Sequence, residues 1–150
     1  MLISPSHLSD FLLAGCRERG EVLTNLKLQK LLFYSQAWSL ALNGQALFDE
    51  DFQAWIHGPV LPSQYARFKD FSWHPITMEV ERPVIDTDTT GFLGDIIDEF
   101  GSESAVALEL MTHREQPWIE ARGNLPPFVP SEAKIPKTSM QNFYRQLGAH

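Results

Sequence analysis

The feature that most constrains the fold is the segment between Thr24 and Gly44, which is apolar on two opposite sides of a predicted helix. Thr24 suits an N-cap and Gly44 a C-terminal stop, so the pattern predicts a helix over 25–43. One apolar stripe contains Leu28, Leu31, Leu32, Ser35 and Leu42, and the other contains Leu26, Phe33, Ala37 and Leu40. A helix with two apolar sides is central and buried.

The polar residues of this helix fall on two narrow seams. Gln29, Gln36 and Asn43 form one seam, and Lys27, Lys30 and Tyr34 form the other. Because both remaining sides are apolar, we expect only these seams to reach water or a partner.

Shorter amphipathic helices are predicted before and after the central one. Their boundaries follow from capping residues, helix breakers and apolar residues at helical spacing. The segments run from Ser4 or Ser6 to Gly20, from Pro62 to about Phe68, from Phe92 to Gly101, from Ser102 to Gln116-Pro117, and from Met140 to Gly148.

Two short strands are predicted from alternating apolar residues, one over 52–56 and a second over 76–80. His57-Gly58-Pro59 is expected to break the first strand, and residues 82–90 and 124–136 are expected to be loops. The predicted fold class is therefore mainly α (α+β): a compact helical domain around a buried central helix, with a small β element. Residues 1–150 are expected to form a single domain.

The composition narrows the classes of partner and compartment. Cys16 is the only cysteine, so neither an intramolecular disulfide nor a cysteine-based zinc cluster can form within one chain. The net charge of −7 opposes binding to a phosphate backbone, so nucleic acid is not the expected partner. The chain shows no basic leader and no apolar run long enough for a bilayer, so a cytoplasmic protein that does not enter the membrane is expected.

The sequence shows no motif of a known catalytic or cofactor site. Its histidines, at positions 7, 57, 74, 113 and 150, are scattered, and no GxSxG, P-loop or GxGxxG string occurs. We therefore expect no metal, no cofactor and no enzymatic activity. Two alternatives stay open: a small phage- or prophage-associated hydrolase using His57, His113, Glu115 or the Asp49–Asp51 cluster, and a bare structural or oligomerisation domain.

Three strings in the chain form a distinctive ordered set. They are TNLKLQKLLFYSQAW at 24–38, QAWIHGPVLPSQYARFKD at 53–70 and THREQPW at 112–118. Together they resemble the Panacea antitoxin domain, the SocA-like family also known from phage-associated proteins. The resemblance lies in Lys27 to Leu32, Ala54-Trp55, Gly58-Pro59-Val60, Tyr65, and the final group His113, Glu115, Pro117 and Trp118, and it spans about residues 5–147.

The resemblance implies a mostly helical antitoxin that neutralises a toxin encoded by an adjacent gene. Members of the family usually neutralise the toxin by forming a direct complex with it, and some members instead act as adaptors that deliver it to a protease. Many members also carry a separate DNA-binding or other accessory domain. No accessory DNA-binding domain is recognised in this chain, so autoregulation through DNA binding is not expected.

The candidate partner-binding residues come from the first two strings. A rigid turn flanked by aromatic residues can present a binding anchor, and we expect the second seam of the central helix to be exposed beside it. The predicted contact residues are Lys27, Lys30, Tyr34, Trp55, His57, Gly58, Pro59 and Tyr65. An alternative stays open for the tryptophans, because Trp38, Trp55, Trp73 and Trp118 can each be explained as core residues.

Overall fold

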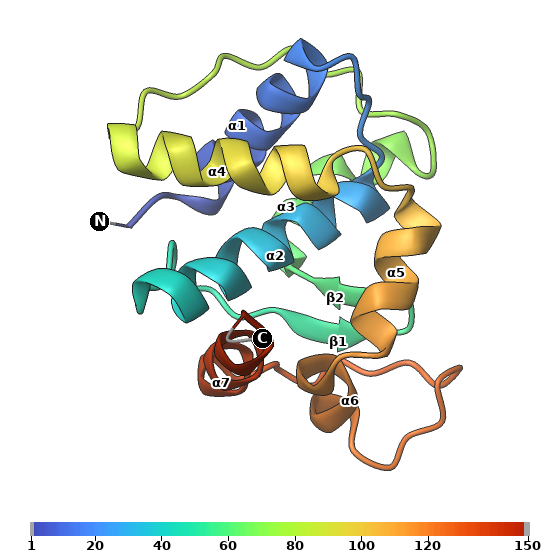
Figure 1. Cartoon of the computed structure of the whole chain (residues 1–150). Helices are drawn as coiled ribbons and strands as arrows, with labels where there is room; N and C mark the ends of the chain where they lie inside the picture. The colour runs from blue at the N-terminus through green and yellow to red at the C-terminus, as the bar shows by residue number, and fades with distance from the viewer. Residues whose placement is uncertain (1, 149–150) are drawn as a thin grey trace.

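The structure is a computed structural model that describes residues 2–148. Its centre is α2 (Asn25–Asn43), which contacts most other elements and crosses the middle of the molecule (Figure 1). The Thr24 hydroxyl accepts a hydrogen bond from the Lys27 backbone N–H at 3.2 Å, and Gly44 ends the helix with a φ of 68°. The predicted bounds and central burial of this helix are confirmed.

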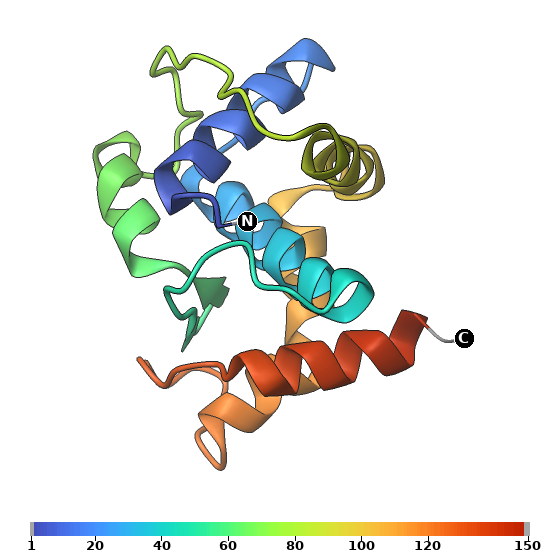
Figure 2. The same cartoon turned by 90° about the vertical axis from the view of Figure 1, so that its left-hand side faces the viewer.

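Six further helices surround α2 within residues 2–148. The helix α7 (Lys137–Gly148) packs along α2 on one side, while α1 (Pro5–Glu18) and α4 (Thr87–Phe100) cover another side (Figures 1 and 2). The remaining three are α3 (Pro62–Phe68), α5 (Ala105–His113) and α6 (Gln116–Arg122), and a short 3-10 helix, η1 (Lys69–Phe71), follows α3. The mainly helical fold class is therefore confirmed.

Some helix boundaries differ from the prediction because other residues cap them. Asp86 caps α4 by accepting from the Thr89 backbone N–H at 2.9 Å, so α4 begins earlier than Phe92. Ser104, rather than Ser102, caps α5. Pro117 lies in the first turn of α6, where its missing N–H costs nothing, so it starts a new helix.

The β element is a hairpin of β1 (Gln53–Trp55) and β2 (Gly58–Val60), paired antiparallel with Trp55 opposite Gly58. The chain returns beside β1 at residues 133–135, where the Ala54 N–H donates to the Ala133 carbonyl at 2.8 Å. The predicted strand over 76–80 is wrong. That segment is extended with Ile76 buried, but its carbonyl groups are bound by Arg17 instead of a neighbouring strand.

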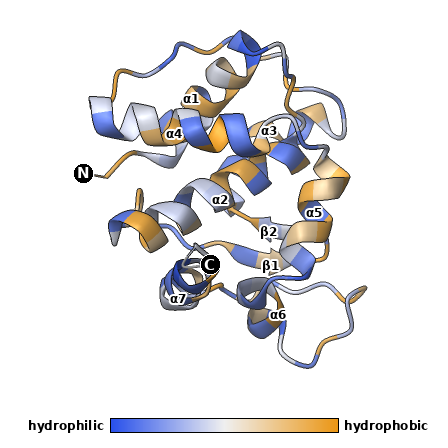
Figure 3. Ribbon diagram, viewed as in Figure 1, coloured by the Kyte–Doolittle hydropathy of each residue, from blue (hydrophilic) through white to orange (hydrophobic). Residues whose placement is uncertain are grey.

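The core is rich in aromatic residues that surround α2. Phe33 contacts Phe52 and Tyr144 edge-on, with ring centroids 5.3 and 6.0 Å apart. Cys16 is buried, and this burial raises the pKa of its thiol to about 11, so the thiol stays protonated. Figure 3 shows apolar and polar residues mixed along α4 and α5, as expected of helices with one face on a core. None of the helices in residues 2–148 combines the length and apolar character that crossing a membrane requires.

Candidate protein-binding site

The first two sequence strings meet where α2 crosses the hairpin. The Lys30 ammonium group donates to the Pro59 carbonyl oxygen at 3.3 Å. Gly58 has a φ of 108°, and a Cβ built on it would lie 2.6 Å from Lys30 Cε and 2.9 Å from the Thr112 hydroxyl oxygen. Glycine is therefore required at this position both by the backbone conformation and by the lack of space.

We call this contact between α2 and the hairpin the junction. The third string joins it through Glu115 and Trp118. One Glu115 carboxylate oxygen accepts hydrogen bonds from the hydroxyls of Tyr34 at 2.5 Å and Tyr144 at 2.9 Å. Trp118 donates its indole N–H to the Trp55 carbonyl at 2.8 Å, and the ring of His113 stacks on Trp118. All three strings are thus connected by specific contacts between distant parts of the chain.

Burial changes the acid–base properties of this junction. Lys30 is fully buried, and the loss of hydration lowers its pKa to about 7, against an opposing effect of Glu109. Burial also raises the pKa of the Glu115 carboxyl above its usual value and lowers the pKa of His113. Each shift has desolvation as its largest cause, as expected for groups inside a packed junction.

The prediction that Lys27, Lys30 and Tyr34 form an exposed seam is wrong. All three side chains are buried. The physical reason is that each polar tip reaches a partner inside the protein, as when the Lys27 ammonium donates to the Gly101 carbonyl at 2.5 Å. Gly58 and Pro59 are also buried, so five of the predicted contact residues lie beneath the surface.

The other three predicted residues do come together, at the surface. Trp55, His57 and Tyr65 line a groove of about 870 Å³, which we call the aromatic groove. The rings of Trp55 and Tyr65 pack with centroids 4.9 Å apart. The His57 side chain is 69% exposed, and its Nδ1 lies 3.0 Å from a Glu109 carboxylate oxygen. The walls of the groove come from the start of α2, the hairpin, α3 with η1, and residues 130–132.

Trp73 also lines the aromatic groove, and sequence reasoning missed it. Trp73 is 75% exposed, so the interpretation of Trp73 as a core residue is wrong. The preceding residue, Ser72, has a φ of 54° and a ψ of −124°, which is a strained conformation for a residue with a side chain. The one signal in the sequence is that Trp73 lies in a polar break between predicted elements, where a core tryptophan is less expected.

The other tryptophans divide between core and surface. Trp118 is buried, whereas Trp38 and Trp55 are half-buried. The core interpretation therefore holds for Trp118, and Trp55 contributes to both the hairpin and the groove.

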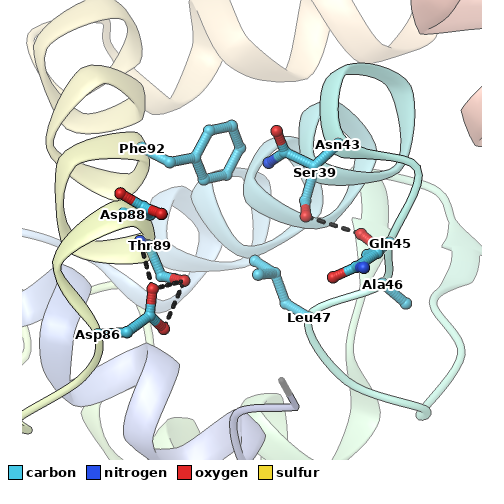
Figure 4. A pocket seen from close by; sticks show the side chains of 9 residues that line it. All are labelled: Ser39, Asn43, Gln45, Ala46, Leu47, Asp86, Asp88, Thr89 and Phe92. Carbon is cyan, nitrogen blue, oxygen red and sulfur yellow. Dashed lines mark hydrogen bonds between the residues drawn. The ribbon is translucent and has the colours of Figure 1, made fainter.

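A second pocket, of about 520 Å³, lies between the end of α2 and the start of α4 (Figure 4). Three of its polar side chains, those of Ser39, Asp86 and Thr89, are occupied in local structure. Ser39 donates to the Gln45 carbonyl at 2.7 Å, and Asp86 binds the backbone and hydroxyl of Thr89, as Figure 4 shows. These contacts cap a helix and hold a loop. A reactive site would instead need titratable groups that converge on one point.

The groups named for a hydrolase do not all lie in one place. His57 Nδ1 lies 3.0 Å from a Glu109 carboxylate oxygen, and the charges of Glu109 and His57 both act on the pKa of His113, so these three groups lie near one another. His113 stacks on Trp118, Glu115 accepts from two tyrosines, and Asp51 pairs with Lys137 at 2.8 Å. Within residues 2–148, no three His, Cys, Asp or Glu side chains are grouped so as to hold a metal ion.

Comparison with known families identifies the family of this chain. The family model described as "Antitoxin SocA-like, Panacea domain" matches residues 28–119, which is more than half of the chain. The matched range contains the whole hairpin, α3, α5 and Trp118, and therefore most of the junction and of the aromatic groove. Comparison with curated proteins and with solved structures gives no match.

Proposed function

Because the chain belongs to the SocA-like antitoxin family with a Panacea domain, we propose that it is an antitoxin that neutralises a cognate protein toxin by direct binding. The toxin is the product of an adjacent gene, and the complex forms in the cytoplasm. The protein acts through its binding surface and catalyses no reaction. A second route to neutralisation starts from the same binding step: the protein delivers the bound toxin to a protease complex.

The observation that carries this proposal is the aromatic groove. Trp73 and Tyr65 are exposed by 75% and 37% beside the half-buried Trp55. Aromatic side chains dominate the energetic centres of protein interfaces, and contiguous exposed apolar patches mark interaction sites. The groove therefore supplies the anchors that a toxin would cover.

The buried junction holds in place the hairpin that forms part of the groove. Lys30 fixes the hairpin through Pro59, and Gln29 accepts the Leu61 backbone N–H at 2.8 Å. A surface held in place before binding loses less conformational freedom when the complex forms. In this proposal Lys27, Lys30, Tyr34, Gly58 and Pro59 act indirectly, whereas Trp55, His57, Tyr65 and Trp73 contact the toxin.

The test is co-expression of this protein with the product of the adjacent gene. Trp73→Ala and Tyr65→Ala should each reduce rescue from toxicity, and His57→Ala should act in the same direction. Loss of about 2 kcal/mol at an interface anchor weakens binding roughly thirtyfold. Val84→Ala is the matched control, because Val84 is fully exposed and does not line the groove.

Circular dichroism and thermal unfolding of each variant separate lost binding from lost folding. The groove assignment fails if the groove variants fold and rescue fully. The antitoxin proposal itself fails if the adjacent product is harmless and does not bind the wild-type protein. Pulse-chase measurement of the toxin distinguishes the two routes, since protease delivery shortens its lifetime and sequestration does not.

A further inference from the structure

The loop between α6 and α7 carries an exposed apolar stretch that the antitoxin proposal does not use. Residues 125–130, Leu-Pro-Pro-Phe-Val-Pro, form what we call the proline segment. Phe128 is 77% exposed and Leu125 is 43% exposed. The last residue of the segment, Pro130, lines the aromatic groove, so the segment and the groove adjoin each other.

The proline segment is held in a defined conformation by Arg122. Arg122 is 5% exposed, and its guanidinium lies 4.9 Å from the centre of the Trp118 ring. It donates hydrogen bonds to the carbonyls of Pro126 at 2.9 Å and of Val129, and to Ala54 in β1 at 3.0 Å. Several carbonyls tied to one buried cation leave little freedom to the loop. Phe128 is therefore presented to solvent by a fixed support.

The aromatic groove suits an extended proline-rich segment better than an added strand. β1 is hydrogen-bonded to β2 on one side and to residues 133–135 on the other. On the α2 side of β2, the Pro59 carbonyl is bound by Lys30, and the following Leu61 N–H is bound by Gln29. Strand addition requires unpaired edge groups, whereas proline-rich segments dock on aromatic side chains such as Trp73 and Tyr65.

We propose that the free protein self-associates as a two-fold dimer in which the proline segment of each copy occupies the aromatic groove of the other. A two-fold contact requires the same surface on both copies to be complementary to itself. Each copy carries both partners of such a contact, because an exposed apolar segment and an aromatic groove adjoin at Pro130. The dimer itself does not depend on the antitoxin assignment, but its competition with a toxin for the groove rests on the proposed function.

Charge sets the conditions under which the dimer forms. Each copy carries a net charge of −7, so two copies repel at low ionic strength. The groove combines apolar rings with polar side chains that include His57, Lys69 and Glu132. Added salt screens the repulsion and leaves the apolar contact in place, so dimerisation should strengthen as salt concentration rises.

The experiment is sedimentation equilibrium of the full chain over a range of protein and salt concentrations. Phe128→Ser removes the anchor of the segment, and Trp73→Ser removes an anchor of the groove. A two-fold dimer contains each substitution twice, so each should weaken the dimer by roughly a thousandfold, the square of the loss expected for one interface hot spot. Val84→Ser, at a fully exposed apolar position that does not line the groove, should leave it unchanged.

Mixing the Trp73→Ser and Phe128→Ser variants tests directly whether the segment of one copy binds the groove of the other. The Trp73→Ser chain still carries an intact proline segment, and the Phe128→Ser chain still carries an intact groove. One complete contact can therefore form between them. The other contact lacks both anchors, but the second loss adds little to a contact that the first has already broken, so the mixture should dimerise more tightly than either variant alone. A synthetic peptide of residues 124–132 should change the tryptophan fluorescence of the Phe128→Ser chain, and the same peptide with serine replacing phenylalanine should not.

Three results would overturn the dimer. They are a wild-type chain that stays monomeric at every concentration, a dimer unaffected by both substitutions, and variants that do not complement each other when mixed. None of these results bears on toxin rescue, which is measured separately. Phe128→Ser should keep rescuing because Phe128 does not line the groove.

Discussion

The side chain of Lys30 packs directly against Gly58. Its Cε lies 2.6 Å from the point that a Cβ at Gly58 would occupy, and its ammonium group donates to the carbonyl oxygen of the next residue, Pro59, at 3.3 Å. Because Lys30 is fully buried, the central helix fixes the turn of the hairpin with an ionisable amine that has no access to water. This contact links the core of the protein to the floor of the aromatic groove.

Gly58→Ala should be strongly destabilising. The new methyl group would overlap Lys30 Cε and approach the Thr112 hydroxyl, and the φ of 108° is unfavourable for alanine. We expect a loss of about 2–4 kcal/mol in the free energy of unfolding, measured by urea denaturation. Gly44→Ala is the matched control, because Gly44 also has positive φ but a methyl group there would have nothing within 4 Å; it should lose only about 1 kcal/mol. Equal losses at the two positions would contradict the packing argument.

Lys30→Met should change the dependence of stability on pH. The folded pKa of Lys30 is lowered to about 7, so between pH 7 and its ordinary pKa the unfolded chain binds more protons at this group than the folded chain. This group therefore makes the wild type more stable as pH rises from 7 towards 10, by at most about 1.4 kcal/mol per pH unit. The Lys30→Met variant lacks this rise in unfolding free energy with pH. At pH 7 it should be at least as stable as the wild type, because burying a charge is costly.

The measurement is the difference in unfolding free energy between wild type and Lys30→Met at pH 7 and pH 9. Lys134→Met provides the control, since Lys134 is exposed. A difference that does not change with pH would show that Lys30 remains fully charged in the folded protein.

Glu115→Ala should destabilise the protein more than Glu115→Gln. Alanine leaves the buried hydroxyls of Tyr34 and Tyr144 without their shared acceptor, at a cost of about 1–3 kcal/mol for each unsatisfied group. Glutamine keeps one acceptor oxygen and removes the charge. Burial raises the folded pKa of Glu115, so its contribution to stability is greatest at low pH and is lost as pH rises through that pKa. The advantage of wild type over Glu115→Gln should therefore decrease from pH 4 upwards in chemical denaturation, and an increase would refute the assignment.

Ser72 and Gly123 offer a reciprocal test of backbone strain. Ser72 has φ and ψ of 54° and −124°, and Gly123 has nearly the same conformation at 60° and −126°. Ser72→Gly should stabilise the protein by about 1 kcal/mol, and Gly123→Ser should destabilise it by about 1–3 kcal/mol. No atom lies within 4 Å of a Cβ at Gly123, so its loss would measure strain alone. Ser72→Ala keeps the strained backbone and should give no gain, and thermal unfolding compares all three variants.

Signals confined to a few neighbouring residues predicted the local structure well. The hydroxyl of Thr24 and the left-handed conformation of Gly44 fix the ends of α2, and both depend on residues within one turn. The two apolar stripes of this helix predicted its central position for the same reason. The three strings also identified the family, and three of the predicted contact residues, Trp55, His57 and Tyr65, lie together in one groove.

The tertiary structure decided which polar groups are buried and which segments pair. Lys27, Lys30 and Tyr34 are buried because they find Gly101, Pro59 and Glu115, which lie 74, 29 and 81 residues away in the chain. The second strand is Gly58–Val60 and not the alternating segment 76–80, because pairing depends on which segment reaches the edge of β1. Periodicity assigns a side chain to a face of its own helix or strand, whereas burial of a charge depends on whether a distant segment places an acceptor beside it.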